Sequence, residues 1–351
     1  MTELAAPPAT PAPPAAPDRA RASLVRAEAH RFVSRRFVRM LVLLGLAGYL
    51  LVVGIAAATS FGRTTPERLA EAEREVTRIV AEQDSFREQC LADPGRPPGV
   101  PVEELCGPPA RAADFRAEDF LDKIPFVLAE ELAPGAVGVA VGTSVLAFLI
   151  GATWVGAEWS TRSIVALLFW EPRRTRVMAV KLAVLVVAAA ALAVAGQALW
   201  WGTARLLAAG LGRTGDPPDG FYAGLLAQQA RSVLLVVLAA LLGFGIANLV
   251  RNTGAALGVG FVWFALLENA VRGFKPAWQE WLLTDNAAAL LSQGGYRLFL
   301  PGEGFVDEDG SFVDSGREVL LSNLHGALVL GLVTALIVGL GVLLFARRDL
   351  H

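Results

Sequence analysis

Histidine, cysteine and lysine are scarce in this chain of 351 residues, which has three histidines, two cysteines and three lysines. The histidines, His30, His325 and His351, lie far apart, and no serine–histidine–acid order or paired carboxylates accompany them. We therefore expect no catalytic machinery, and we interpret His325 as a hydrogen-bonded packing residue. An intramembrane enzyme is the least favoured of the functions considered below.

The few lysines also argue against a nucleotide site. A phosphate-binding loop requires the pattern G-x-x-x-x-G-K-[ST]. None of Lys123, Lys181 and Lys275 follows a glycine, and none precedes serine or threonine. We expect the chain itself to bind no ATP and no other cofactor, and its net charge of −2 gives no indication of nucleic-acid binding.

Charged residues make up only 18% of the chain, whereas 54% is hydrophobic and gathers in long uncharged runs. A helix that crosses a hydrocarbon core of about 30 Å needs roughly 20 residues. The runs predict an all-α integral membrane protein with six transmembrane helices. The expected order is a disordered tail (1–20), an amphipathic helix (21–39), the first span (40–61), a helical extracytoplasmic domain (62–132), the second span (133–157), a cytoplasmic loop (158–178), the third, fourth and fifth spans (179–204, 222–250 and 252–270), an extracytoplasmic or re-entrant segment (271–318) and the sixth span (319–346).

The basic residues predict the orientation. Arginines are dense before the first span, in the loop after the second span and just after the sixth, whereas the long loops on the other side are rich in acids. By the positive-inside rule, both ends of the chain are cytoplasmic. The abundance of arginine over lysine indicates a GC-rich bacterial genome, so we expect a multi-pass protein of the bacterial plasma (inner) membrane.

The segment 21–39 carries apolar residues at helical spacing among arginines. This pattern is typical of an amphipathic helix that lies in the cytoplasmic headgroup layer. The alternative is a helix that simply continues the first span into water.

The first extracytoplasmic loop is predicted to be helical. Apolar residues recur there at steps of three and four, and Thr65 followed by Pro66 marks the helix start. We expect this stripe to serve internal packing rather than a ligand site; it comprises Leu69, Ala72, Val76, Ile79, Gln83, Phe86 and Cys90. Both cysteines, Cys90 and Cys106, fall in this loop, which predicts a disulfide in an oxidising compartment.

Polar residues within the expected spans are few. Gln197, Asn248 and Glu268 are candidates for lining a substrate pathway. Glu268 lies at the outer end of its run, so we interpret it as a solvated interface acid rather than a coupling residue. This argues against ion-coupled transport and leaves a transporter that is powered from elsewhere.

The loop between the second and third spans carries the most informative pattern. The segment 158–174 predicts a short interfacial helix that Pro172 ends, with Glu158, Arg162 and Glu171 in water and Ile164, Leu167 and Leu168 towards the membrane. An ordinary basic loop that obeys the positive-inside rule is the alternative interpretation.

This loop resembles the type 2 ABC exporter permeases. The family's pattern is an acid, then Gly-Thr-Leu, then Pro-x-x-Arg and Lys-Leu. This chain has a similar series in Glu158, Ser163-Ile164, Leu167-Leu168, Pro172-Arg173-Arg174 and Lys181-Leu182. Its carboxyl-terminal residues 344–349 are similar to the usual ending of the family. Arg162 departs from the pattern because the family has glycine there. Six spans, a large first outer loop and a preceding amphipathic helix agree with the family as well.

The resemblance implies a function and partners. The loop would form the coupling helix that docks on a separate cytoplasmic ATPase, ATP being bound by that partner, and the permease would pair with a second copy or a paralogue. Partner docking would then involve Glu158, Arg162, Ser163, Pro172, Arg173 and Arg174. The segment after the fifth span would form short re-entrant helices. The competing hypothesis is a membrane-anchored assembly or signalling protein that acts through its extracytoplasmic helices.

Overall fold

The chain forms two compact units in its computed structural model. Unit 1 comprises Met1–Val42, Ser144–Leu192 and Val233–His351, and unit 2 comprises Leu43–Thr143 and Ala193–Ser232. The structure describes all residues except 1–16, 94–100, 302–304, 307–311, 314–315 and 348–351. Most of the tail that we expected to be disordered therefore lies outside the described residues.

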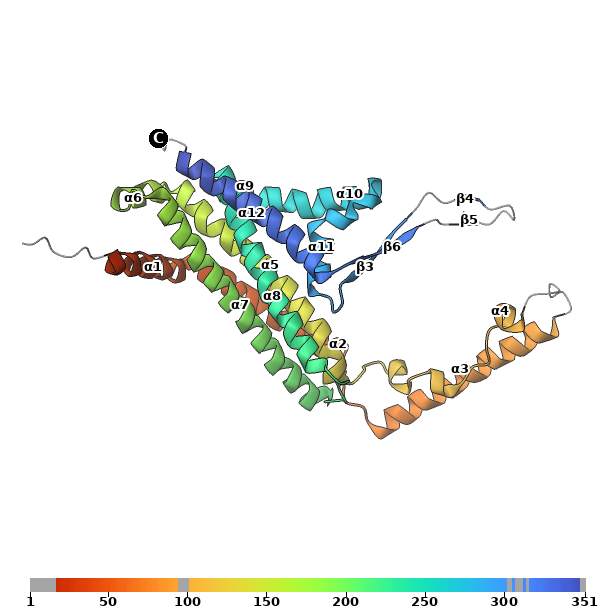
Figure 1. The fold of residues 1–351 in the computed structure, drawn as a ribbon. Helices are drawn as coiled ribbons and strands as arrows, with labels where there is room; N and C mark the ends of the chain where they lie inside the picture. The colour runs from red at the N-terminus through yellow and green to blue at the C-terminus, as the bar shows by residue number, and fades with distance from the viewer. Residues whose placement is uncertain (1–16, 94–100, 302–304, 307–311, 314–315, 348–351) are drawn as a thin grey trace, which may run out of the picture. The chain divides into compact units, whose positions relative to one another are not determined.

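Six helices of the described chain are long and apolar enough to cross a bilayer, so this is a helical multi-pass membrane protein (Figure 1). The predicted number of spans is confirmed. The spans are α2 (Arg36–Thr59), α5 (Leu128–Ser160), α7 (Arg174–Leu211), α8 (Phe221–Val250), the continuous run of α9 (Thr253–Phe261), η3 (Val262–Leu267) and α10 (Glu268–Phe274), and α12 (Asn323–Arg347).

The observed ends of the spans differ from the predicted ones in two ways. α5 and α7 extend beyond their uncharged runs, because a helix continues past flanking charges as long as its backbone hydrogen bonds are made. The predicted start of the sixth span was wrong: residues 319–321 belong to a strand, and α12 begins at Asn323. A short apolar run does not distinguish a buried strand from the end of a helix.

In unit 1, glycines bring α5 and α8 into close backbone contact. A Cβ atom on Gly151 would collide with the carbonyl oxygen of Ala240, and one on Gly243 would collide with that of Phe148. Small residues allow such approach, which is the usual way that membrane helices gain packing energy.

The amphipathic segment is a separate helix, α1 (Pro17–Ser34), and Arg35 interrupts the helix before α2 begins. The prediction of one helix over 21–39 was therefore wrong at its carboxyl end. Glu28 and Phe32 of α1 are buried, whereas Val25 and Val33 are exposed.

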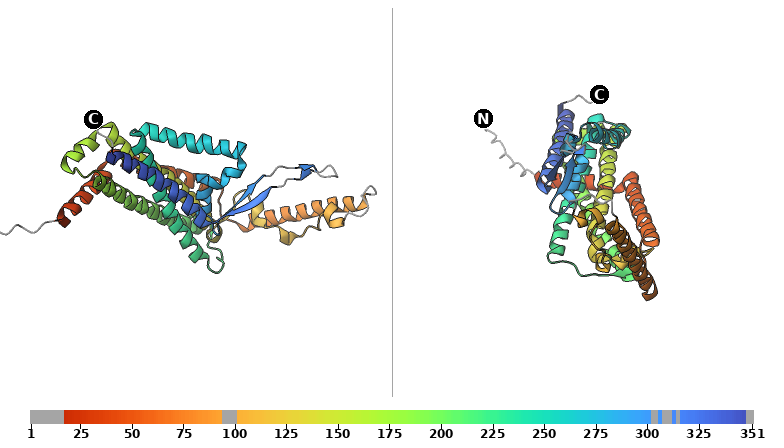
Figure 2. Two further views of the ribbon diagram at one scale, coloured as in Figure 1. Left: turned by 45° about the horizontal axis from the view of Figure 1, so that its top comes forward. Right: turned by 90° about the vertical axis from the view of Figure 1, so that its right-hand side faces the viewer.

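Beyond α10, unit 1 contains short helices and two β-ribbons. η4 (Pro276–Trp281) and α11 (Leu283–Leu291) follow the reversal of the chain after α10 (Figure 2). The first ribbon pairs β3 (Tyr296–Leu300) with β6 (Arg317–Leu321) in antiparallel register, Leu298 opposite Val319. The second pairs β4 (Phe305–Val306) with β5 (Phe312–Val313). The structure therefore differs from the predicted all-α fold, because it contains these short strands.

Three aromatic side chains at the end of α10 and in η4 are exposed. Phe274, Trp278 and Trp281 are 84%, 64% and 63% exposed. Exposed tryptophan is typical of membrane–water interfaces. The re-entrant course predicted for this segment stays a prediction.

Unit 2 contains the helical layer predicted between the first two spans. Its long helix is α3 (Pro66–Ala92), which begins at an N-cap where Thr65 accepts a hydrogen bond from the amide of Arg68. The shorter elements are α4 (Val102–Cys106), η1 (Ala112–Asp114), η2 (Ala117–Phe120), β1 (Phe126–Val127) and β2 (Gly212–Arg213).

The predicted stripe of α3 is only partly right. Ala72 and Val76 are buried, but Gln83 and Phe86 are exposed, Phe86 to 71%. In the same unit, Arg213 of β2 hydrogen-bonds Glu118 of η2 and thereby lowers the pKa of this carboxyl below its usual range.

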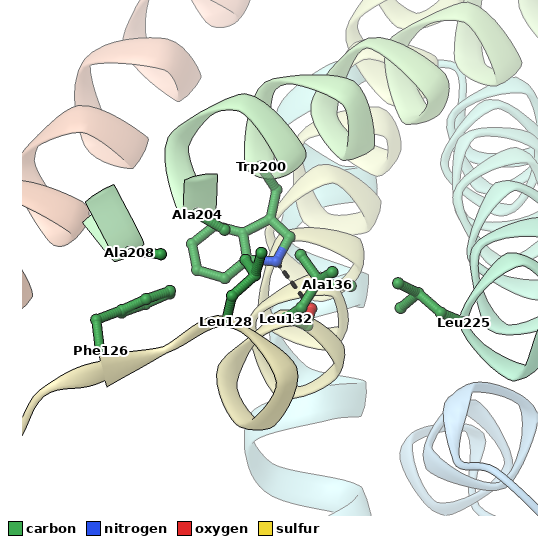
Figure 3. Packing of buried hydrophobic residues seen from close by; sticks show 8 residues of the cluster. All are labelled: Phe126, Leu128, Leu132, Ala136, Trp200, Ala204, Ala208 and Leu225. Atoms are coloured by element: carbon green, nitrogen blue, oxygen red, sulfur yellow. Dashed lines mark hydrogen bonds between the residues drawn. The ribbon is translucent and has the colours of Figure 1, made fainter. Parts of the chain in front are cut away.

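The core of unit 2 lies around Trp200 of α7 (Figure 3). The indole donates a hydrogen bond from Nε1 to the carbonyl oxygen of Leu132 at 2.9 Å, so its single polar atom is satisfied. The buried cluster consists of Phe126, Leu128, Leu132, Ala136, Trp200, Ala204, Ala208 and Leu225. Next to it, β1 and β2 pair in parallel, with Phe126 opposite Gly212.

The structure joins Cys90 and Cys106 in a disulfide between α3 and α4, with the Cα atoms 5.8 Å apart. We expect replacement of both cysteines by serine to destabilise the helical layer of unit 2 by about 3 kcal/mol, since the bond joins residues 16 positions apart and so closes a loop in the unfolded chain. Mass spectrometry of the protein isolated from membranes without reducing agent should show the bonded peptide pair. Two free thiols in that sample would contradict the assignment.

Candidate functional site

The loop predicted to dock a partner contains a short helix between two spans. α6 (Ser163–Trp170) follows the end of α5 and precedes α7 (Figure 1). Arg162 stands before it in the left-handed conformation, at a φ of 55°. This is the conformation that glycine adopts most easily, and glycine occupies this position in the resembling family. Arg162 therefore adopts the turn conformation, although it replaces the glycine of that family's pattern.

One face of α6 is buried and the other is open. Ile164 is fully buried and Leu167 is 7% exposed, so both pack inside the protein and do not face the membrane as predicted. Phe169, on the open side, is 85% exposed. Arg162 and Ser163 are exposed at the start of the helix.

Glu158 lies in the last turn of α5 and is buried, so the prediction that it stays in water was wrong. It is 3% exposed. Lys181 of α7 donates to it, with Nζ 2.9 Å from Oε1 and 2.8 Å from Oε2. The guanidinium of Arg35 lies 2.6 Å from the same Oε1.

Lys181 also connects this pair to the amino-terminal helix. Its Nζ lies 2.7 Å from Oε2 of Glu28, and both residues are almost wholly inaccessible. Glu28 also forms an ion pair with Arg31, whose side chain is half-exposed and whose guanidinium lies 3.2 Å from the carboxylate. We call Glu28, Arg35, Glu158 and Lys181 the buried charge cluster.

The buried charge cluster is electrically balanced, with two carboxylates and two cations. Its aromatic surroundings strengthen it: Nζ of Lys181 lies 5.0 Å above the ring centre of Trp154, and Phe32 packs edge-on against that ring at 4.9 Å. Removal of one partner from such a cluster leaves an uncompensated charge in a medium of low dielectric constant, which is costly. The cluster therefore fixes α1, the start of α2, the end of α5 and α7 to one another.

A second set of contacts ties the carboxyl-terminal helix to the same loop. The indole of Trp159 donates to Asn248 at 3.0 Å and packs edge-on against Phe345 of α12. Arg251 lies 4.7 Å over the Trp159 ring, and Arg174 donates to the carbonyl of Phe345 at 3.4 Å.

The predicted docking residues thus separate into two groups. Arg162, Ser163, Pro172 and Arg173 are exposed. Glu158 and Arg174 are engaged within the protein, so we expect them to position α6 rather than to contact a partner. Glu28 was not among the residues predicted from the sequence. It lies four residues after Leu24 and four residues before Phe32, which puts an acid on the apolar face of α1.

The three candidates for a substrate pathway each serve a local contact. Asn248 accepts from Trp159, and Gln197 donates to the carbonyl of Ala136 at 3.0 Å. Glu268 is 1% exposed, so its interpretation as a solvated interface acid was wrong. It accepts from Trp263 at 3.0 Å and from the first amides of α11, those of Leu283 and Thr284, and so caps that helix.

Comparison with known proteins adds no assignment. No protein-family model and no curated protein matches the chain. Function is therefore argued from the geometry of this loop and from the sequence pattern that it carries.

Proposed function

We propose that this chain is the membrane-spanning subunit of an ATP-driven exporter of the type 2 ABC permease kind, which docks a separate ATPase through α6. The observation that carries the proposal is a short helix between two spans, with Phe169 exposed on one side and the buried charge cluster behind it. An exposed aromatic residue beside basic side chains is a common anchor in protein interfaces.

The arrangement suits transmission of movement. Glu158 lies five residues before α6 and pairs with Arg35, between α1 and α2, and with Lys181 of α7, which in turn holds Glu28 of α1. A displacement of α6 would therefore pass to α1, α2 and α7 together. Tightly packed contacts of this kind transmit a displacement to their partners rather than deform continuously. Energy released on the partner would reach the spans by this route.

The partner supplies the energy because the chain offers no evident alternative. Glu268, its one acid within a predicted span interior, is committed to capping α11. Within the membrane, a coupling acid is expected to face a cavity or a water-filled path. The cytoplasmic side of the protein would then bind an ATPase on each of two permease copies.

Purification and reconstitution test this proposal. The purified chain alone should show no ATP hydrolysis above a detergent control, and a cytoplasmic ATPase encoded with it should copurify. Together in liposomes, the two should hydrolyse ATP and transport. Uphill transport by the chain alone in ATP-free liposomes would contradict the proposal.

A second candidate is an assembly or signalling protein that acts through the outer helical layer. The observation that favours it is Phe86, 71% exposed on α3 in the layer fixed by the disulfide. Copurification of an envelope protein without any ATPase would support this candidate in place of the exporter.

A further inference from the structure

Two cavities in unit 1 meet at Val38, a buried residue near the start of α2. The first, of about 410 Å³, lies between the start of α2, the end of α5 and the first residue of α9, and the second, of about 170 Å³, lies between α2, α5, α7 and α8. The α5 residues that line them are Ala147, Ile150, Thr153, Trp154 and Ala157, and Thr161 lines the first cavity just after α5 ends. Ala147, Ile150, Trp154 and Ala157 recur at steps of three and four, and Thr153 lies beside Trp154, so the lining follows one side of the helix. The cavities are two halves of one groove, which we call the α2–α5 groove.

The first half of the α2–α5 groove is built for an anion. Arg35 and Arg36 line it, and no carboxylate is among its lining residues. Glu158 neutralises Arg35, whereas Arg36 is exposed and has no ion-pair partner among the described residues. Trp154 lines the same half, is fully buried, and its indole Nε1 has no acceptor in the described part of the chain.

The end of a helix adds to this positive environment. Thr253, which also lines the first half, is the first residue of α9, and Asn252 caps the amide of Ala255 only. The free amides of a helix start favour a negative group.

The second half of the α2–α5 groove is apolar. Phe32, Val42, Ile150 and Leu185 are among its walls, and no charged residue lines it. Val42 lies four residues further along α2 than Val38, or about 6 Å along the helix axis at 1.5 Å per residue. The polar half therefore lies where α2 enters the bilayer, and the apolar half lies at the depth of acyl chains.

We propose that the α2–α5 groove binds one anionic glycerophospholipid, with its phosphate beside Arg36 and an acyl chain past Val38. A free anion would leave the apolar half unfilled, and an uncharged apolar molecule would leave Arg36 without an ion-pair partner. The lipid comes from the leaflet in which α2 begins. This inference does not depend on the proposed transport function.

Native mass spectrometry of the purified full-length chain tests the inference. The probes are phosphatidylglycerol, phosphatidylcholine with the same acyl chains, and glycerol 3-phosphate as a headgroup without chains. We expect phosphatidylglycerol to be retained preferentially, and R36Q to lower its retention about five- to tenfold, as the loss of one charge-assisted phosphate contact near a membrane implies.

Two further variants locate the ligand. R26Q removes an exposed arginine of α1 that does not line the groove, and it should leave retention unchanged. A157L places a larger side chain in the groove, and it should lower retention as R36Q does. If A157L does not fold, the comparison of R36Q with R26Q still decides the question.

Three results would overturn the inference. The first is an equal loss in R26Q and R36Q, which would mean general surface charge. The second is full retention in folded A157L. The third is binding of glycerol 3-phosphate as tight as that of the lipid, which would identify a phosphate site that does not require acyl chains.

Discussion

Replacement of Lys181 by methionine should lower the free energy of unfolding by about 3–5 kcal/mol, because it removes the fully buried cation of the cluster and leaves two buried carboxylates that face only the partly exposed Arg31 and Arg35. Methionine has a similar volume, so the loss reflects charge rather than a cavity. Lys181 is fully buried, and it contacts both Glu28 and Glu158. The measurement is equilibrium unfolding of the purified protein in mixed micelles, with the yield of inserted protein as a second readout.

Charge balance makes this prediction specific. Adding E28Q to K181M leaves Glu158 paired with Arg35, so the double variant should be more stable than K181M alone. K275M is the matched control, because Lys275 is exposed at the end of α10. A K181M protein as stable as K275M would show that the cluster does not hold these helices together.

The spans could be predicted because hydropathy is a local property of the chain. Six uncharged runs gave six helices of sufficient length, and the two cysteines of one loop are joined. Pro66 after Thr65 likewise marked the start of α3, since a cap and its helix are neighbours in sequence. For these features the physical cause lies within a few residues of the feature itself.

The buried charge cluster could not be predicted in the same way. Glu28 and Lys181 are 153 positions apart, and Arg35 and Glu158 are 123 apart. An acid near the end of a span has the same local pattern whether water or a lysine surrounds it, so Glu158 and Glu268 were both assigned to solvent. Residues 319–321 were assigned to a span for a similar reason, because their pairing with β3 is not visible in their own hydrophobicity.

Truncation of Phe169 to alanine should weaken docking of the proposed ATPase at least about tenfold, without changing the amount of inserted permease. The side chain is 85% exposed, so the folded chain loses little packing. An aromatic anchor at the centre of an interface contributes about 2 kcal/mol or more, which corresponds to a factor above ten in affinity. Affinity between tagged permease and ATPase, together with ATP-driven transport in liposomes, measures the effect.

The control for F169A is F86A, since Phe86 is also an exposed phenylalanine on a helix but belongs to α3 of unit 2. R173E should weaken docking in the same direction as F169A, because Arg173 is exposed, whereas R174E also removes the hydrogen bond to Phe345 and therefore mixes two effects. If F169A and R173E bind the ATPase as tightly as F86A does, α6 is not the docking element. The basic loop would then serve only to orient the chain in the membrane, as the positive-inside rule requires.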